Sequence, residues 1–237
     1  MRVLLVTDYG YLAGGAEVIV FLLRDALLQR GHEVKVFSTS AGSAQAQILA
    51  DEVCFGSTSR WRTLLQAANP LAALRLRSLL RAFRPHVVHV SLYLTQLSPL
   101  ILRELRDSPT IYYAQWYRAI CPVGSRLLPG GQACPHQPGL ACYRQGCLPL
   151  RDHAPLALQR RLDHHWAPQA FDQVMAISHA VAAELRAYGP AYLRNPLVCH
   201  PGTPLVEPRA EMDGRPSVIS AGQIGRAHVC TPSHANI

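Results

Sequence analysis

Residues 1–39 read MRVLLVTDYGYLAGGAEVIVFLLRDALLQRGHEVKVFST, and this stretch decides the fold. Residues 2–7 are a short apolar run with no room for a helix's polar face, which predicts a strand buried on both sides. A glycine-rich loop follows, and apolar side chains at helical spacing then predict an amphipathic helix over residues 16–30. Gly31 ends that helix, and residues 34–37 predict the next strand. Strand, glycine loop, helix and strand together make one right-handed crossover unit of an open α/β sheet.

Gly14 and Gly15 lie immediately before the predicted helix. Because glycine has no Cβ, a ligand can approach the backbone closely there. The first N–H groups of a helix have no partner within it and carry the positive end of its dipole, so a phosphate or another anion binds favourably there. The two glycines could equally serve only to let the chain turn, and the sequence leaves both interpretations open.

The glycine loop matches neither of the common nucleotide-binding motifs. The dinucleotide fingerprint G-x-G-x-x-G and the G-K-[ST] phosphate loop are both absent. Instead, Gly14-Gly15-Ala16-Glu17 and the segment RGHEV at residues 30–34 resemble, without a gap, the N-terminus of GT-B glycosyltransferases, particularly family 4. The resemblance implies a Rossmann-like parallel sheet with helices on both faces, which forms the N-terminal half of a GT-B fold. It also implies that Gly14, Gly15, Ala16 and Glu17 line the donor and acceptor cleft.

The resemblance continues along the chain. The segment RPHVVH at residues 84–89 is similar to the family's R-P-D-V-V-H, which adds His89 to the candidate binding residues. His89 would lie near the carboxyl end of its strand, where ligands of open α/β sheets bind, although a histidine in an apolar strand is more often a core residue. Ser178 resembles the serine of the family's strand-to-helix junction and is the last candidate binding residue. Asn195-Pro196 resembles the turn that leads out of the first domain.

The rest of the chain alternates predicted strands and helices. Further strands are expected at residues 52–55, 86–91, 110–114, 173–177 and 192–193. Further helices are expected at residues 64–83 with an interruption at 69–70, at 95–106, at 156–166, and at 178–188 with Ser178 as cap. This alternation favours a doubly wound parallel sheet. The helix at 156–166 carries arginines and histidines that could meet an anionic lipid or a lipid-linked acceptor.

Composition and charge limit the partners and the cellular location that we expect for the protein. The chain has 237 residues, is 49% hydrophobic, and carries a formal charge of +8. No dense basic run with interleaved aromatics is present, which argues against a nucleic-acid partner. The N-terminus lacks the pattern of a signal peptide, and no run of about 18 apolar residues is present to span a membrane. We therefore expect a cytoplasmic protein, with peripheral contact at the inner membrane surface as a further expectation.

Four cysteines cluster between residues 121 and 147, in a turn-rich segment with little core of its own: Cys121, Cys134, Cys142 and Cys147. Without a signal peptide, clustered cysteines suggest metal more than disulfides, and Zn²⁺ favours four such ligands. The spacing lacks C-x-x-C, so loosely packed, reduced thiols are the alternative. Some family 4 members resemble this segment but carry His-Asp before it, where this chain has Gln115-Trp116.

The sequence divides into four parts. Residues 1–200 form the expected Rossmann-like acceptor-side domain, with the Cys-rich insertion at 121–147, and the proline- and glycine-rich residues 201–216 read as a linker. Residues 217–223 resemble the first strand of a second, donor-side domain. Residues 224–237 depart from the family and resemble a translated sequencing adapter, so we exclude them from fold reasoning. His228, Cys230 and His234 are then not metal ligands.

The resemblance implies a retaining glycosyltransferase of cell-envelope polysaccharide type. Its donor would be a nucleotide-diphosphate sugar and its acceptor a sugar or a lipid-linked sugar. Because the family's diphosphate clamp and nucleotide pocket lie mostly in the second domain, we expect this fragment to be inactive alone. Two alternatives stay open: an NAD(P)-dependent oxidoreductase or epimerase, which NAD binding would reveal, and a non-enzymatic metal-binding interaction module, which stoichiometric zinc would reveal.

Overall fold

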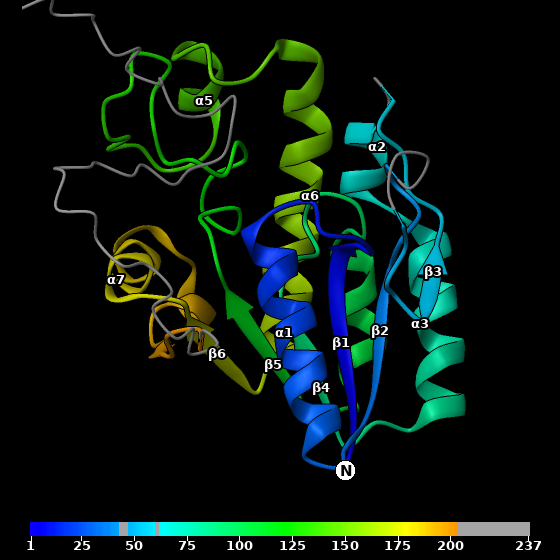
Figure 1. The fold of residues 1–237 in the computed structure, drawn as a ribbon. Helices are drawn as coiled ribbons and strands as arrows, with labels where there is room; N and C mark the ends of the chain where they lie inside the picture. The colour runs from blue at the N-terminus through cyan, green and yellow to red at the C-terminus, as the bar shows by residue number, and fades with distance from the viewer. Residues whose placement is uncertain (43–46, 60–61, 203–237) are drawn as a thin grey trace, which may run out of the picture. The chain divides into compact units, whose positions relative to one another are not determined.

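The computed structural model describes residues 1–42, 47–59 and 62–202. They contain a parallel sheet of seven strands in the order β3-β2-β1-β4-β5-β6-β7 (Figure 1). The strands are β1 (Arg2–Tyr9), β2 (Glu33–Thr39), β3 (Glu52–Cys54), β4 (Val87–Val90), β5 (Thr110–Ala114), β6 (Gln173–Ala176) and β7 (Leu197–Val198). This confirms the predicted Rossmann-like parallel sheet. Residues 1–201 form one compact unit, and apart from Pro201 and Gly202 the predicted linker, second-domain start and tail lie outside the described residues.

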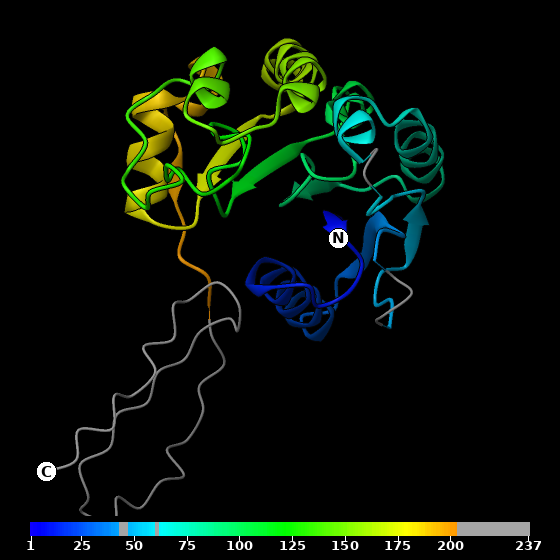
Figure 2. The same ribbon diagram turned by 90° about the horizontal axis from the view of Figure 1, so that it is seen from above.

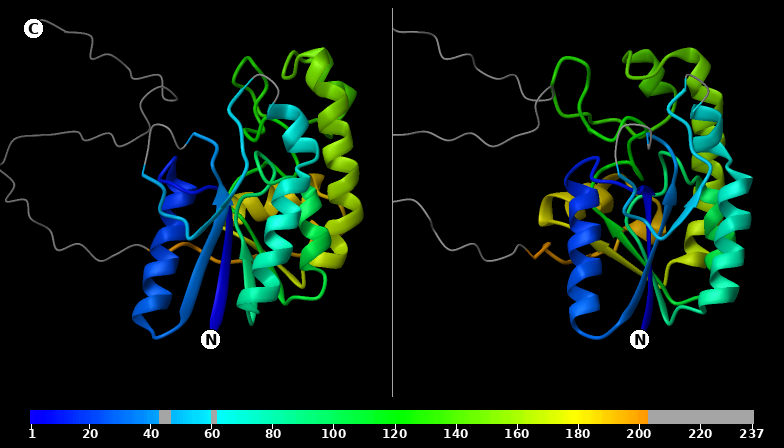
Figure 3. Two further views of the ribbon diagram at one scale, coloured as in Figure 1. Left: turned by 90° about the vertical axis from the view of Figure 1, so that its right-hand side faces the viewer. Right: turned by 45° about the vertical axis from the view of Figure 1, so that its right-hand side comes forward.

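Helices cover both faces of the sheet, as predicted, but unequally (Figures 2 and 3). On one face, α1 (Gly15–Gln29) packs Val20 and Phe21 against β1 and β2. The opposite face is covered by α3 (Pro70–Phe83), α4 (Leu102–Leu105), α6 (Leu150–Ala170) and α7 (His179–Tyr188), which share a larger apolar cluster with β1, β4, β5 and β6. The buried strands alternate between the two clusters, because successive strand residues point to opposite faces.

Local signals explain where several elements begin and end. Gly31 has φ 77° and follows α1; its N–H donates to Leu28 O at 2.9 Å and the N–H of His32 donates to Leu27 O at 3.1 Å. These two bonds form a Schellman motif, which confirms the predicted helix stop. Ser178 Oγ accepts from the N–H of Val181 at 3.2 Å and caps α7, also as predicted.

The helical region predicted at residues 64–83 forms two helices, broken where the sequence indicated. The first is α2 (Arg62–Ala67), and the second, α3, begins at Pro70. Asn69 caps α3, because its side-chain oxygen accepts from the N–H of Ala72 at 3.1 Å. Pro70 is suited to a first helical turn, where its missing N–H costs nothing.

The helix predicted at residues 95–106 is wrong over its first four residues. Helical structure begins only at Pro99, with a short 3₁₀ turn (Pro99–Ile101) followed by α4. The N–H groups of Thr95, Gln96 and Leu97 donate instead to the carboxylate of Asp8, at 2.9, 2.8 and 2.9 Å. A helix that began at Thr95 would leave these first N–H groups without internal partners, so the bonds to Asp8 do not explain its late start. Ser98 explains it, because its φ of 66° cannot continue a right-handed helix and it directly precedes Pro99.

Two further expectations need correction. Residues 192–193 do not form the last strand; Ala191–Leu193 is a 3₁₀ turn, and β7 follows at Leu197–Val198. The helix predicted at 156–166 is longer, because α6 spans Leu150–Ala170 and contains two prolines. Proline inside a helix removes a hydrogen bond and opposes the assignment from sequence, so packing against the rest of the domain outweighs propensity here.

Candidate functional site at the carboxyl ends of the strands

The chain reverses its direction across the sheet between β1 and β4. From β1 the chain passes through α1, on one face of the sheet, to β2 on one side of β1. The strands β4 to β7 lie on the other side of β1, and their connecting helices cover the opposite face of the sheet. In open α/β sheets the ligand crevice lies outside the carboxyl ends of the strands at such a switch point. The loops that follow β1, β4 and β5 therefore define the candidate site.

Asp8 joins two of these loops. It lies near the end of β1, is fully buried, and accepts from the hydroxyl and the N–H of Thr95 as well as from the N–H groups of Gln96 and Leu97. Burial raises the pKa of Asp8, while these hydrogen bonds lower it in part. The carboxylate therefore fixes the loop after β4 against the end of β1.

The predicted glycine turn lies open at the N-terminus of α1. Gly15 is exposed and Gly14 is half-buried. Neither has a positive φ, and a Cβ built on Gly15 would meet nothing within 4 Å. Neither the backbone conformation nor the packing of the described residues therefore explains glycine at position 15.

Glu17 is buried, at 4% exposure, and Ala16 beside it is half-buried. Burial raises the pKa of Glu17 to about 7, the charge of Asp8 adds to the rise, and hydrogen bonds from the N–H groups of Glu17 and Gly14 oppose it. A glutamate at the third helical position that reaches back to the cap N–H forms half of a capping box. Glu17 therefore has a structural role at this helix end, whatever ligand role it carries.

The other two predicted site residues lie on β4 and shortly after β6, two strands that β5 separates in the sheet. His89 on β4 is half-buried, with Nδ1 at 3.3 Å from Ser91 Oγ and its ring 5.5 Å from that of Tyr113. Burial lowers the pKa of His89 to about 4, so the ring is neutral at pH 7. Ser178 follows β6, and its hydroxyl oxygen accepts the cap hydrogen bond described above.

Sequence reasoning missed polar side chains that the fold brings to the same edge. Gln115 directly follows β5, and both of its side-chain polar atoms are buried without a hydrogen-bond partner in the described part of the chain; the hydroxyl of Thr7 on β1 is buried and unpartnered in the same way. Buried polar groups are nearly always hydrogen-bonded, so such exceptions call for an explanation. Gln115 is half-buried and is therefore a candidate ligand contact, whereas Thr7 has no exposed surface; the same is true of Ser38, whose hydroxyl is also unpartnered. The available signal was a polar residue at the end of a buried strand, which also applies to Asp8.

The Cys-rich segment is tied to the domain by arginines. Arg126, 6% exposed, donates to Glu184 Oε2 at 2.8 Å and to His136 O at 2.9 Å, and its guanidinium lies 3.8 Å from the ring centre of Tyr188. Arg160 of α6 donates to Pro138 O. These contacts order a segment that has little core of its own.

The four predicted zinc ligands are free thiols, each half-buried. Burial, followed by the charges of Cys142, Cys134 and Cys121, raises the pKa of Cys147, so the four lie in one region. Within residues 1–42, 47–59 and 62–202, however, no group of three or more His, Cys, Asp or Glu side chains has an arrangement that could hold a metal ion. The structure gives the zinc prediction no support.

The fold is an open α/β domain, and the carboxyl ends of its strands at the switch point are the candidate ligand site. The family model of Glycosyltransferase Family 4 matches residues 13–203. The chain therefore belongs to glycosyltransferase family 4, which confirms the family inferred from the GGAE and RGHEV segments. None of the curated proteins matches the sequence significantly.

Several solved structures are similar at low identity. UDP-GlcNAc 2-epimerase from Methanocaldococcus jannaschii is 9% identical with a TM-score of 0.46, covering 84% of this chain and 45% of that one. HepE from Anabaena, in complex with UDP and glucose, is 18% identical with a TM-score of 0.42, covering 86% and 45%. The glycosyltransferase SnogD from Streptomyces nogalater is 15% identical with a TM-score of 0.39, covering 92% and 55%. The chain thus spans about half the length of these structures. Among the described residues, no helix combines the length and apolarity needed to cross a membrane.

Proposed function

We propose that this chain is the acceptor-binding N-terminal half of a retaining glycosyltransferase with a nucleotide-diphosphate sugar as donor. The observation that carries the proposal is Gly15. It has an ordinary backbone conformation, faces open space, and lies at the positive end of α1 beside the switch point. A bare backbone at this place is explained by an anionic group that must approach the helix N–H groups closely.

The charges around Gly15 suit a departing diphosphate. Sugar transfer develops negative charge on the leaving group, and fixed N–H donors aimed at that charge stabilise the transition state. Because the pKa of Glu17 is raised to about 7, its carboxyl is partly protonated at neutral pH and repels the diphosphate less than an ordinary glutamate would.

The unpartnered side chains suit the acceptor. Gln115 can donate and accept, as recognition of sugar hydroxyls requires, and its side-chain polar atoms have no partner in the described part of the chain. A neutral His89 can accept a hydrogen bond from an acceptor hydroxyl at the carboxyl end of β4 and so orient it. We propose a sugar or a lipid-linked sugar as the acceptor, with transfer at the cytoplasmic side of the inner membrane. The exposed Arg161 and His165 of α6 would be available to a membrane surface.

The second wall of the crevice is proposed to come from a donor-side domain beyond this chain. The solved structures compared above are about twice as long as the part that this chain matches. We therefore infer that the 237-residue chain does not turn over alone.

A transferase assay tests the proposal. The purified chain is incubated with a panel of nucleotide-sugars and candidate acceptors, alongside a protein expressed from the gene with the sequence beyond codon 223 restored. We expect turnover from the longer protein only, and its loss in a Gly15→Leu variant that unfolds at an unchanged temperature. Robust turnover by the short chain would defeat the half-enzyme interpretation. Tight NAD binding without nucleotide-sugar binding would instead favour the oxidoreductase alternative.

A further inference from the structure

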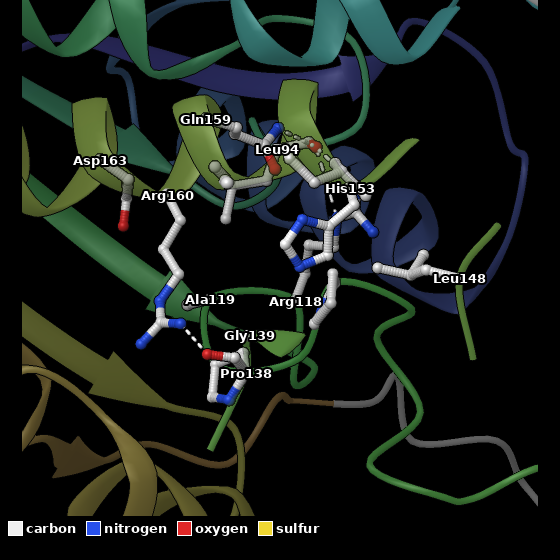
Figure 4. Close-up of a pocket in the computed structure, with 13 residues that line it drawn as sticks. Leu94, Arg118, Ala119, Pro138, Gly139, Leu148, His153, Gln159, Arg160 and Asp163 are labelled. Atoms are coloured by element: carbon white, nitrogen blue, oxygen red, sulfur yellow. Dashed lines mark hydrogen bonds between the residues drawn. The ribbon is translucent and has the colours of Figure 1, made fainter. Parts of the chain in front are cut away.

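A cavity of about 150 Å³ lies between α6, the loop after β5 and the Cys-rich segment (Figure 4). Its walls are largely apolar and include Leu94, Pro122, Leu148 and Leu156. Two cations reach it from different elements. Arg118 comes from the loop after β5, and Arg160 extends from α6 toward Pro138 on the opposite wall (Figure 4).

Neither arginine is in an ion pair with a carboxylate in the described part of the chain. Arg118 donates from Nη2 to Gln66 Oε1 at 3.0 Å, and from Nη2 and Nε to Leu94 O at 3.2 and 3.4 Å. Arg160 donates from Nη1 to Pro138 O. A guanidinium has five N–H donors, so each side chain keeps donors that these neutral oxygens do not use.

The carboxylate in the lining does not supply the missing charge at contact distance. Asp163 is 2% exposed, and its two oxygens accept from the hydroxyls of Tyr93 and Tyr192, each at 2.6 Å. Burial lowers the pKa of Arg118 to about 10 and also lowers that of Arg160, yet both stay charged at neutral pH. Two half-buried cations without contacting counter-charges therefore share one small, mostly apolar space.

We propose that this cavity binds a phosphate group carried by the acceptor, with the apolar walls holding the carbon atoms next to it. Planar guanidinium groups match phosphate oxygens in paired hydrogen bonds, and such charge-assisted bonds are strongest where water is excluded. The inference rests on the proposed function, because it specifies the acceptor of that same site. The phosphate can belong to a lipid-like alkyl chain or to a sugar, and both share the chemistry that the arginines recognise.

Calorimetric titration of the 237-residue chain tests the proposal without any nucleotide. Inorganic phosphate, butyl phosphate and glucose 6-phosphate are compared with butanol and glucose at fixed ionic strength. We expect all three phosphate probes to bind and the neutral probes not to bind. Tighter binding of butyl phosphate indicates a lipid-like phosphate, and tighter binding of glucose 6-phosphate indicates a sugar phosphate. Equal binding of butanol and butyl phosphate would overturn the proposal.

The variants separate recognition from folding. We expect Arg118→Gln and Arg160→Gln each to weaken phosphate binding about tenfold or more, in line with a charge-assisted contact. Arg186→Gln, at an exposed position on α7, is the control and should change binding less than about twofold. Should Arg118→Gln unfold, Arg118→Lys keeps the charge, and its retained binding supports the proposal while complete loss counts against it.

The two proposals can fail separately. Absence of phosphate binding by the folded chain, or an equal loss in Arg160→Gln and Arg186→Gln, overturns the cavity assignment and leaves the transferase assay untouched. Turnover by the short chain overturns the half-enzyme interpretation and leaves the phosphate titration valid.

Discussion

Replacing Glu17 by glutamine should remove a specific part of the pH dependence of stability. Burial raises the pKa of Glu17 from 4.5 to about 7 in the folded protein. A carboxyl whose pKa is raised on folding binds its proton more tightly in the native state. Its protonation therefore stabilises the fold at low pH, and that contribution is lost as the pH rises through about 7. Glutamine at position 17 does not titrate, so the variant lacks this contribution.

The size of this contribution to stability follows from the shift in the pKa of Glu17. Each unit of pKa shift corresponds to about 1.4 kcal/mol between the fully protonated and fully ionised limits. Over the accessible range from about pH 8.5 to 5.5, linkage predicts that protonation of Glu17 adds about 2 kcal/mol to the free energy of unfolding. Other groups titrate in this range, Asp163 among them with a pKa raised to about 6. The quantity to compare is therefore the difference between the wild type and Glu17→Gln.

Urea unfolding at pH 5.5, 7.0 and 8.5 measures that difference. We expect Glu17→Gln to gain stability relative to the wild type as the pH rises, by about 2 kcal/mol across the series. Glu33→Gln, at an exposed position, is the control and should follow the wild type. Parallel curves for the wild type and Glu17→Gln would refute the reasoning, because they would mean that the carboxyl is not desolvated at the helix end.

Three further predictions concern the fold around the site. Arg126→Met removes the cation that contacts Glu184 and should lower the free energy of unfolding by about 2 kcal/mol. It should also increase thiol labelling of the Cys-rich segment. The surface variant Arg81→Met is the control and should change neither the stability nor the labelling. A chelator should leave the thermal midpoint unchanged, because arginines order that segment; a lowered midpoint together with stoichiometric released zinc would restore the zinc expectation. Gly189→Ala places a Cβ against the carbonyl of Leu185 and should lower the free energy of unfolding by about 2 kcal/mol. Gly15→Ala meets no neighbouring atom and should raise the free energy of unfolding by up to about 1 kcal/mol. Equal effects of the two variants in urea unfolding would contradict both glycine assignments.

Local patterns predicted the parts of the fold that depend on local physics. The apolar runs of β1 and β5, the Gly31 stop and the Ser178 cap need only neighbouring residues, and the structure confirms them. The failure at residues 95–98 has a local and a distant part. Ser98 has a positive φ immediately before Pro99, and the conformation of residues 95–97 is fixed by hydrogen bonds to Asp8, 87 to 89 positions away. Periodicity in a short window carries no information about such a partner.

The candidate site divides in the same way. The glycine turn was visible because its motif is contiguous, and so were His89 and Ser178 as ends of predicted strands. Gln115 and Arg118 could be recognised as candidate site residues only from the structure, which places β5 beside β4. The spacing of the cysteines in the sequence suggested a metal site. The contacts that order the segment are made by arginines to its backbone carbonyls, and a sequence pattern does not show such contacts.

One short loop connects the crevice with the phosphate cavity. Asp8 fixes the N–H groups of residues 95–97, and the preceding carbonyl, that of Leu94, accepts from Arg118 and from Gln159 Nε2 at 2.8 Å. Hydrogen bonds therefore run from β1 through this loop to α6. Because the loop has few regular hydrogen bonds of its own, its position depends on these side chains. A change at Asp8 should consequently disturb binding in both places, although neither ligand would touch Asp8.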